Sequence, residues 1–206
     1  MQKLLPGILA MALIVVASNI LVQHPMGAYL TWGALTYPLS FLVNDITNRL
    51  QGVRAARTVV LAGFMAGLVC SVIGTKIYND FGPLVTLRIA LGSGTAFLLG
   101  QLLDVSIFDR LRRAAWWRAP LVSTLIGSTI DSMIFFTIAF AATLTFLEPG
   151  NDVSWAASPG PLLGFGPQVP FWVSLAVADW CVKFGIALFG LLPFRLFVAK
   201  MTAPVA

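Results

Sequence analysis

Four charged side chains lie inside apolar stretches of the chain: Asp104, Asp131, Asp179 and Lys183. Each would cost about 2.5–3.5 kcal/mol at the centre of a membrane-spanning helix on insertion scales. An apolar residue at the same position would remove that cost, so keeping the charge indicates a use. Carboxylates accept N–H hydrogen bonds and can exchange protons when buried. We therefore interpret the four residues as parts of a buried binding site that is compatible with a proton-coupled step.

Amide, hydroxyl and aromatic side chains near these charges extend the candidate site. The polar candidates are Asn44, Asp45, Gln101 and Ser128, and the candidate stacking surfaces are Tyr37, Phe41, Phe97 and Trp180. A carboxylate, an amide and an aromatic face together suit a planar heterocycle with several donors and acceptors, such as a guanine-like ring. Strong anions suit the set less, because it contains more Asp than Lys.

Each candidate also has a purely structural interpretation, which the sequence leaves open. Asp179 and Lys183 are one helical turn apart and can form an intrahelical ion pair. The Asn-Asp pair at 44–45 can cap a helix, the Gln101–Asp104 segment can clamp two helices, and the aromatic residues can serve packing alone. Asp131 has no charged residue four positions away, which favours a role in the site.

The composition places these groups in a membrane. The chain has 206 residues, of which 10% are charged and 58% hydrophobic, and its mean hydropathy is +0.89. A soluble domain carries about 25% charged residues, so neither a soluble globule nor a disordered chain fits. One spanning helix takes about 20 residues, so six would leave short loops and no room for an ATPase module or a soluble catalytic domain. Cys70 and Cys181 have no Cys or His neighbours, so we expect no metal and no cofactor.

The apolar runs predict an all-α membrane protein, a bundle of six transmembrane helices that forms a single domain over residues 1–206. The predicted spans are Leu4–Gln23, Leu30–Asn44, Ala55–Tyr78, Leu87–Ile107, Ala119–Leu147 and Phe171–Val198. Pro38 removes a backbone donor and clashes with the preceding turn, so the second helix should be kinked or broken. The first run exceeds the ~7–15 apolar residues of a signal peptide core, so it should be a retained helix.

The positions of Lys and Arg predict the orientation. Ten of them fall on one side of the predicted spans: Lys3, Arg49, Arg54, Arg57, Arg110, Arg112, Arg113, Arg118, Arg195 and Lys200. The other side has only Lys76 and Arg88. Because short cytoplasmic loops carry the excess of basic residues, both termini should be cytoplasmic and the long Glu148–Pro170 connection should face outward.

The helical rise of about 1.5 Å per residue places the polar residues at two depths. Asp131 and Asp179 should lie at nearly the same level, near the middle of the bilayer, with Lys183 one turn further inward. Gln101 and Asp104 should lie nearer the cytoplasm, at the level of residues 44–45. The sequence therefore predicts two polar layers that line a cavity with a cytoplasmic exit.

Small residues recur every four positions in two predicted helices. They are Gly63, Gly67 and Ser71 in the third span and Gly92, Ala96 and Gly100 in the fourth. Such rows let helices approach closely in lipid. They form either packing seams inside one bundle or the face of a homodimer.

Other function classes fit the residues less well. An intramembrane serine hydrolase would use Ser93, but the only histidine, His24, lies near the outer end of the first span, and acyl transfer needs a base within hydrogen-bond reach. A channel would need repeated rings of one polar type. The net charge of +5 does not indicate nucleic acid, since the basic residues stand between apolar runs.

Five segments form a recognisable set. They are Leu35-Thr36-Tyr37-Pro38-Leu39-Ser40-Phe41-Leu42-Val43-Asn44-Asp45, Gly92-Ser93-Gly94-Thr95-Ala96-Phe97, Gly100-Gln101-Leu102-Leu103-Asp104, Ser128-Thr129-Ile130-Asp131-Ser132 and the late helix with Asp179 and Lys183. Together they resemble the YhhQ-type queuosine precursor transporters, also called the vitamin uptake transporter family. The resemblance covers about residues 18–200.

The resemblance implies a six-helix importer in the bacterial inner (plasma) membrane. It implies a 7-deazapurine substrate, chiefly 7-cyano-7-deazaguanine with the 7-aminomethyl form as a second one, used to make queuosine in transfer RNA. The implied substrate-binding residues are Asn44, Asp45, Gln101, Asp104, Ser128, Asp131 and Lys183, to which we add Asp179 for its position one turn from Lys183. The expected partners are the small molecule and the lipid bilayer, with a homodimer left open and no nucleic acid.

Two modes of transport follow from the resemblance. The first is a secondary or facilitated transporter, which is not an enzyme. The alternative is a substrate-capture membrane subunit of an ATPase-driven vitamin uptake complex. The first predicted helix lacks an Ala-x-x-x-Ala docking row, which favours the solitary transporter.

Overall fold

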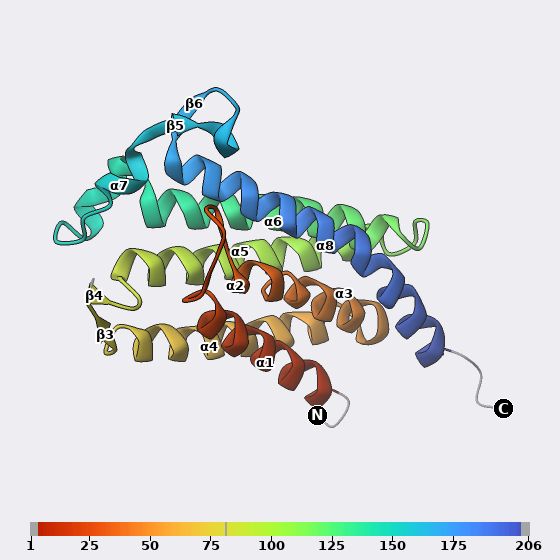
Figure 1. The fold of residues 1–206 in the computed structure, drawn as a ribbon. Helices are drawn as coiled ribbons and strands as arrows, with labels where there is room; N and C mark the ends of the chain where they lie inside the picture. Colours follow the sequence, from red (N-terminus) through yellow and green to blue (C-terminus); the bar gives the residue numbers. More distant parts are fainter. Residues whose placement is uncertain (1–3, 81, 203–206) are drawn as a thin grey trace.

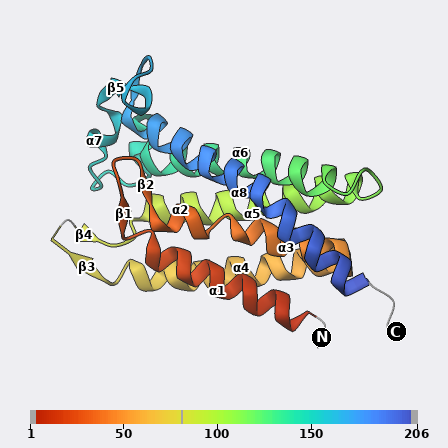
Figure 2. The same cartoon turned by 45° about the vertical axis from the view of Figure 1, so that its right-hand side comes forward.

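The computed structural model describes residues 4–80 and 82–202, which fold into a bundle of long helices (Figure 1). Helices α3 and α5 lie in the middle, α1 and α4 pack on one side, and α6 and α8 pack on the other (Figure 1, Figure 2). The helices are α1 (Leu5–Leu21), α2 (Trp32–Thr36), α3 (Leu39–Gln51), α4 (Val53–Gly74), α5 (Leu87–Leu111), α6 (Arg118–Phe140), α7 (Ser154–Ala157) and α8 (Phe171–Thr202), with 3-10 turns η1 (Ala142–Leu147) and η2 (Leu162–Gly164).

Short antiparallel strand pairs occupy the connections at one end of the bundle, which we call the hairpin end (Figure 1). The strands are β1 (Pro25–Met26), β2 (Leu30–Thr31), β3 (Tyr78–Asn79), β4 (Gly82–Pro83), β5 (Pro159–Pro161) and β6 (Gln168–Pro170), paired β1–β2, β3–β4 and β5–β6. They are too short to change the all-α class. They order the connections that the hydropathy pattern left as loops.

Four helices among the described residues are long and apolar enough to cross a membrane. They are α4, α5, α6 and α8, with mean hydropathies of 1.4 to 1.9. Helix α1 is apolar but has only 17 residues. The helical structure agrees with the predicted all-α membrane fold, while the six spans and the cytoplasmic position of both termini stay predictions. Lys3, which contributed to the orientation, lies outside the described residues.

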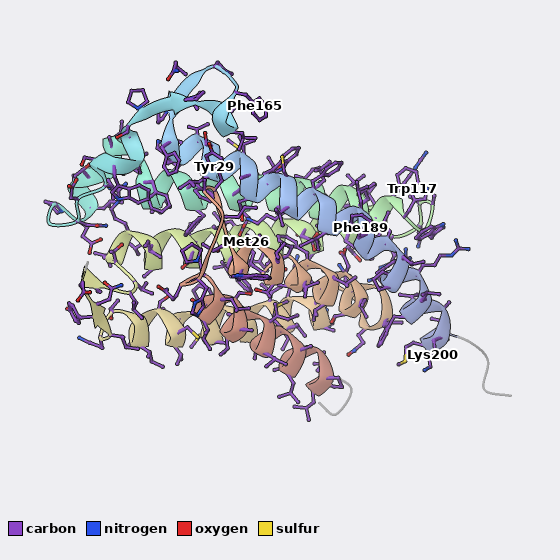
Figure 3. All side chains as sticks on the ribbon, viewed as in Figure 1. Met26, Tyr29, Trp117, Phe165, Phe189 and Lys200 are labelled. Atoms are coloured by element: carbon purple, nitrogen blue, oxygen red, sulfur yellow. The ribbon has the colours of Figure 1, made fainter. Side chains whose placement is uncertain are left out.

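Basic residues gather at the other end of the bundle, which we call the arginine-rich end. Helices α3, α5 and α8 finish there and α4 and α6 begin there (Figure 1). Figure 3 shows Trp117 and Lys200 at this end, and Tyr29 and Phe165 towards the opposite one. The described residues that define it are Arg49, Arg54, Arg57, Arg110, Arg112, Arg113, Arg118, Arg195 and Lys200.

The predicted break in the second span lies at Tyr37–Pro38, between α2 and α3. The predicted end of that span at Asn44 is wrong, because α3 continues to Gln51 and ends at Gly52 with φ 89°. Asn44 and Asp45 are therefore in the middle of a helix, which excludes the capping interpretation. The apolar run stopped early because α3 buries polar side chains against the other helices.

The predicted fifth span also ends too late. Helix α6 stops at Phe140, and the chain continues through extended Ala141 into η1. The cause is a set of hydrogen bonds at the hairpin end. Buried Arg88 donates from Nε to the Ile138 carbonyl at 2.9 Å and from Nη2 to the Ala141 carbonyl at 2.7 Å. These bonds satisfy carbonyl groups that the end of a helix leaves without partners.

Small residues form packing seams inside the bundle, as one of the two interpretations predicted. A Cβ on Gly63 would lie 2.6 Å from Met11 Cγ on α1, and one on Gly92 would lie 3.2 Å from the Phe135 carbonyl oxygen on α6. Gly100 and Gly127 face each other across α5 and α6, each with the other's carbonyl oxygen within 3.0 Å of its ideal Cβ position. The homodimer alternative stays a prediction.

Gly127→Ala is expected to push α5 away from α6 and to destabilise the fold. The new methyl would lie 2.8 Å from the Gly100 carbonyl oxygen and 3.0 Å from Asp104 Cβ, and backbone cannot move aside as a side chain can. Overpacking of this kind costs about 1–3 kcal/mol. Denaturation in detergent measures the loss. The matched control is Gly185→Ala on α8, where no atom lies within 4 Å of the new methyl; equal stability of the two variants would contradict the tight α5–α6 contact.

Candidate functional site

Lys183 is the centre of a buried polar group that we call the lysine cluster: Tyr37, Asp131, Ser132, Asp179 and Lys183. The Lys183 Nζ lies 2.6 Å from Asp131 Oδ2 and 2.6 Å from Asp179 Oδ2, and it donates to Ser132 Oγ at 2.8 Å. Ser132 in turn donates to Asp179 at 2.7 Å, and the Tyr37 hydroxyl donates to Asp131 Oδ1 at 2.7 Å. The residues come from the α2–α3 break, α6 and α8, so the break places an aromatic hydroxyl beside the charges.

The lysine cluster bears on both interpretations of the pair on α8. Asp179 and Lys183 do form an intrahelical ion pair, but Lys183 also binds Asp131 of α6. Two carboxylates therefore share one ammonium group, and Lys183 and Asp131 are each only 3% exposed. Burying charge is costly even when it is paired. An intrahelical pair that served only to neutralise Lys183 for membrane insertion would need one carboxylate and not two.

A second group, the carboxyl cluster, lies between α3, α5 and α6 on the side of the arginine-rich end: Asn44, Asp45, Gln101, Asp104 and Thr124. The Asn44 Nδ2 donates to Asp104 Oδ2 at 2.9 Å and to the Gln101 carbonyl oxygen at 3.3 Å. The Thr124 Oγ1 lies 3.1 Å from Asp45 Oδ2 and 3.4 Å from Asp104 Oδ1. These contacts bring together the four residues that the sequence assigned to the inner layer.

Two amide oxygens of the carboxyl cluster lack a hydrogen-bond donor. They are Asn44 Oδ1 and Gln101 Oε1, and both side chains are fully buried. The Asn44 amide cannot be turned around, because its nitrogen already faces two acceptors. Gln101 donates from Nε2 to Ser40 Oγ at 2.7 Å. Buried polar groups are almost always satisfied, so two acceptors without donors mark a place for a ligand or water.

The predicted stacking residues separate into two sets. Tyr37 packs edge-on against Phe41 and Phe97, with ring centroids 6.3 and 6.1 Å apart, and Lys183 Nζ lies 5.3 Å from the Tyr37 ring centre. These three rings lie beside the clusters. Trp180 instead donates to Thr129 at 2.8 Å and stacks on Phe184, so its contacts lie outside both clusters.

Ser128 is buried but bonds to neither cluster. Its hydroxyl donates to the Leu125 carbonyl of its own helix at 3.2 Å. Sequence analysis missed Ser132 and Thr124, whose hydroxyls contact the clusters. A signal was available, because Thr124, Ser128 and Ser132 recur every four residues and so share one face of α6.

Two small cavities flank the clusters. A groove of about 20 Å³ lies between α3, α6 and α8, with Asp45 and Thr124 among its lining residues. A cavity of about 60 Å³ lies between α1, α4 and α5 in the half nearer the hairpin end, lined by Tyr37 and Phe97 with small and hydroxyl residues. Sites for drug-sized ligands measure about 300–1,000 Å³. The two predicted polar groups are present among the described residues, but neither cavity is lined by Asp131, Lys183, Gln101 or Asp104. The single cavity that both layers were predicted to line is not seen in these two cavities, because the polar side chains bond to one another.

The family described as "Putative vitamin uptake transporter" matches residues 31–198. The chain belongs to this family. No solved structure matches it.

Three curated relatives extend the comparison. The chain is 34% identical over 195 residues to a protein of Escherichia coli (strain K12) named "Queuosine precursor transporter", covering 88% of this chain and 79% of that one. A "Probable queuosine precursor transporter" of Haemophilus influenzae is 35% identical over 153 residues, covering 62% and 65%. Another of that name from Bacillus subtilis (strain 168) is 26% identical over 195 residues, covering 85% and 74%.

Membership of the family agrees with the helical architecture. A vitamin uptake transporter is not an enzyme, and several apolar helices of spanning length indicate a multi-pass membrane protein. Residues 31–198 include both clusters and the break at Pro38.

Proposed function

We propose that this vitamin uptake transporter imports queuosine precursors across the bacterial inner (plasma) membrane by secondary or facilitated transport. The expected substrate is 7-cyano-7-deazaguanine, with the 7-aminomethyl form as the second. The names of the Escherichia coli, Haemophilus influenzae and Bacillus subtilis relatives support this substrate class. The observation that carries the proposal is the pair of buried amide oxygens without donors, next to carboxylates and aromatic rings.

The donor and acceptor pattern suits a deazaguanine. Its guanine-like edge carries N–H donors, and the site supplies acceptors in Asp131, Asn44 and Gln101. Its flat ring suits the faces of Tyr37 and Phe97. Lys183 offers a donor to the ring carbonyl if substrate displaces one of its carboxylate partners. All eight predicted polar residues, Asp179, Ser128, Asp45 and Asp104 included, stay assigned to this site or its exit.

A path through the bundle follows from the order of these features. The cavity between α1, α4 and α5 has Tyr37 and Phe97 among its lining residues. Tyr37 contacts the lysine cluster through Asp131. The carboxyl cluster comes next, and Asp45 and Thr124 line the groove beyond it. Substrate would enter at the hairpin end, bind between the clusters and leave past Gln101 and Asp104 towards the arginine-rich end.

Purified chain in proteoliposomes tests the proposal. Labelled 7-cyano-7-deazaguanine should equilibrate or accumulate inside vesicles that contain this chain alone, and no uptake should occur in empty vesicles. Failure of the chain alone, with uptake restored by an added ATPase complex, would identify a substrate-capture subunit instead. Unchanged uptake in both Asp131→Asn and Gln101→Ala would contradict the site.

Gln101→Leu is expected to weaken substrate binding selectively. Leucine fills a similar volume but removes an acceptor from a fully buried position, and one hydrogen bond of this kind is worth about 1–3 kcal/mol. We therefore expect KM for 7-cyano-7-deazaguanine to rise about 5- to 150-fold. An analogue without the exocyclic amine should lose less, because it has fewer donors to leave unpaired. Gln168→Leu in exposed β6 is the matched control, and equal losses for both substrates would contradict the contact.

A further inference from the structure

Asp45 and Asp104 of the carboxyl cluster are bridged by the hydroxyl of Thr124, and each has one further donor, Ser123 on Asp45 and Asn44 on Asp104. The Thr124 Oγ1 lies 3.1 Å from Asp45 Oδ2 and 3.4 Å from Asp104 Oδ1. A hydroxyl carries one proton, so it can satisfy only one carboxylate at a time. The carboxyl groups come from different helices, Asp45 from α3 and Asp104 from α5. Their separation therefore depends on how closely these two helices pack.

In the described part of the chain, no cation forms an ion pair with either carboxyl group. Among the residues that the structure describes, no Lys or Arg nitrogen lies within 4.0 Å of either carboxylate. Arg49 follows Asp45 by one turn of α3 and its charge acts on that carboxyl group, although its guanidinium donates to the Arg112 carbonyl. The other charged groups on the surrounding helices have partners of their own. Arg112 binds Asn48, Lys183 binds Asp131 and Asp179, Arg118 lies over Trp117 and Arg195 lies over Trp116. The lysine cluster, in contrast, holds an ammonium between its carboxylates.

Two ionised carboxylates are costly to hold side by side in a buried site. Asp45 is 2% exposed and Asp104 is fully buried. Bulk water is largely excluded, so the repulsion between two carboxylates is little screened and favours a proton on one of them. The aspartic proteases show the same principle with two carboxyl groups that share one proton.

Water can reach Asp45. Asp45 and Thr124 line the groove of about 20 Å³ between α3, α6 and α8, and about 10–15 Å³ is enough for one water molecule. The fully buried Asn44, which is bonded to Asp104, also presents an oxygen without a donor. Asn44 does not line the groove, so its oxygen is a separate acceptor next to Asp104. A proton leaving Asp45 has room for a water acceptor in the groove.

We propose that Asp45 and Asp104 form a proton-coupling site, which makes the chain a proton-driven transporter. The proposal rests on the proposed function and adds the driving ion. In the closed state one proton is held on one carboxyl group of the pair. On release, that O–H bond breaks, the proton passes to water in the groove, and two carboxylates remain. Their repulsion separates α3 from α5, which opens the layer past which substrate leaves.

The test uses the full chain in proteoliposomes with the membrane potential clamped. Uptake of labelled 7-cyano-7-deazaguanine is compared with and without an inward proton gradient. One proton per substrate allows up to about tenfold accumulation for each pH unit of gradient. The ratio of the two uptakes should exceed one in the parent chain and fall to one in Asp45→Asn and Asp104→Asn. Asp152→Asn, in the exposed outer connection, should keep the parent ratio.

A spectroscopic measurement keeps the proposal falsifiable if the Asn variants transport nothing. Infrared spectra of the parent chain at neutral pH should contain a protonated-carboxyl band that both Asn variants lack and Asp152→Asn retains. A parent chain without this band would overturn the proposal. A ratio that stays above one in both Asn variants, or accumulation driven by a sodium gradient in place of protons, would also overturn it.

Exchange of substrate with no response to any gradient would overturn the coupling but leave the proposed function standing. No uptake and no exchange by the parent chain would overturn both.

Discussion

Lys183→Met is expected to destabilise the bundle by about 3–5 kcal/mol and to lower uptake of 7-cyano-7-deazaguanine by at least about 100-fold. Lys183 is 3% exposed, and both Asp131 and Asp179 lie 2.6 Å from its nitrogen. Methionine preserves the length of the side chain but leaves the buried Asp131 and the partly buried Asp179 without their shared cation. Denaturation in detergent measures the stability, and proteoliposomes measure the uptake.

A second substitution separates the structural role of Lys183 from its role in transport. Adding Asp131→Asn to Lys183→Met removes one of the unpaired charges, so part of the lost stability should return while uptake stays low. The matched control is Lys200→Met, at an exposed position near the end of α8. Parent-like uptake in Lys183→Met would show that the lysine cluster serves only the fold.

Arg88→Met is expected to lower the free energy of unfolding by about 2–5 kcal/mol, because two buried carbonyl groups lose a charged donor. Arg88 is fully buried and binds the Ile138 and Ala141 carbonyls where α6 ends. Glu148 completes this arrangement by accepting the backbone N–H groups of Leu87 and Arg88 at 3.1 Å each, where α5 begins. The loss should appear as earlier unfolding of the hairpin end in hydrogen exchange.

The effect of Arg88 on transport should be indirect. Its hydrogen bonds are all at the hairpin end, so KM of the folded variant should stay near that of the parent chain while the yield of folded protein falls. Arg57→Met, at an exposed position of α4, is the matched control for removing one positive charge. A large change in KM with unchanged stability would instead place Arg88 in the substrate path.

The depth of polar residues could be predicted from the sequence because helical geometry is regular. A constant rise placed Asp131 and Asp179 at one level, and the structure joins them through Lys183. It likewise placed Gln101 and Asp104 near residues 44–45, where Asn44 now bonds to Asp104. The break at Pro38 was predicted for a local reason, the missing backbone donor. Both inferences need only the chain near the residue in question.

Helix ends and hydrogen-bond partners could not be predicted from the local sequence. Hydropathy extended the fifth span past Phe140, because the Arg88 side chain that terminates α6 lies about fifty positions away in the sequence. It ended the second span at Asn44, because polar residues that face a packed interior look like a loop when read one by one.

The chain itself therefore determined that this is a membrane protein with charges at two depths, since composition, proline chemistry and helical rise are local properties. The tertiary structure alone decided which charges meet, because that depends on how helices distant in sequence pack. The shared lysine of Asp131 and Asp179 and the shared threonine of Asp45 and Asp104 both arise only when α3, α5, α6 and α8 come together.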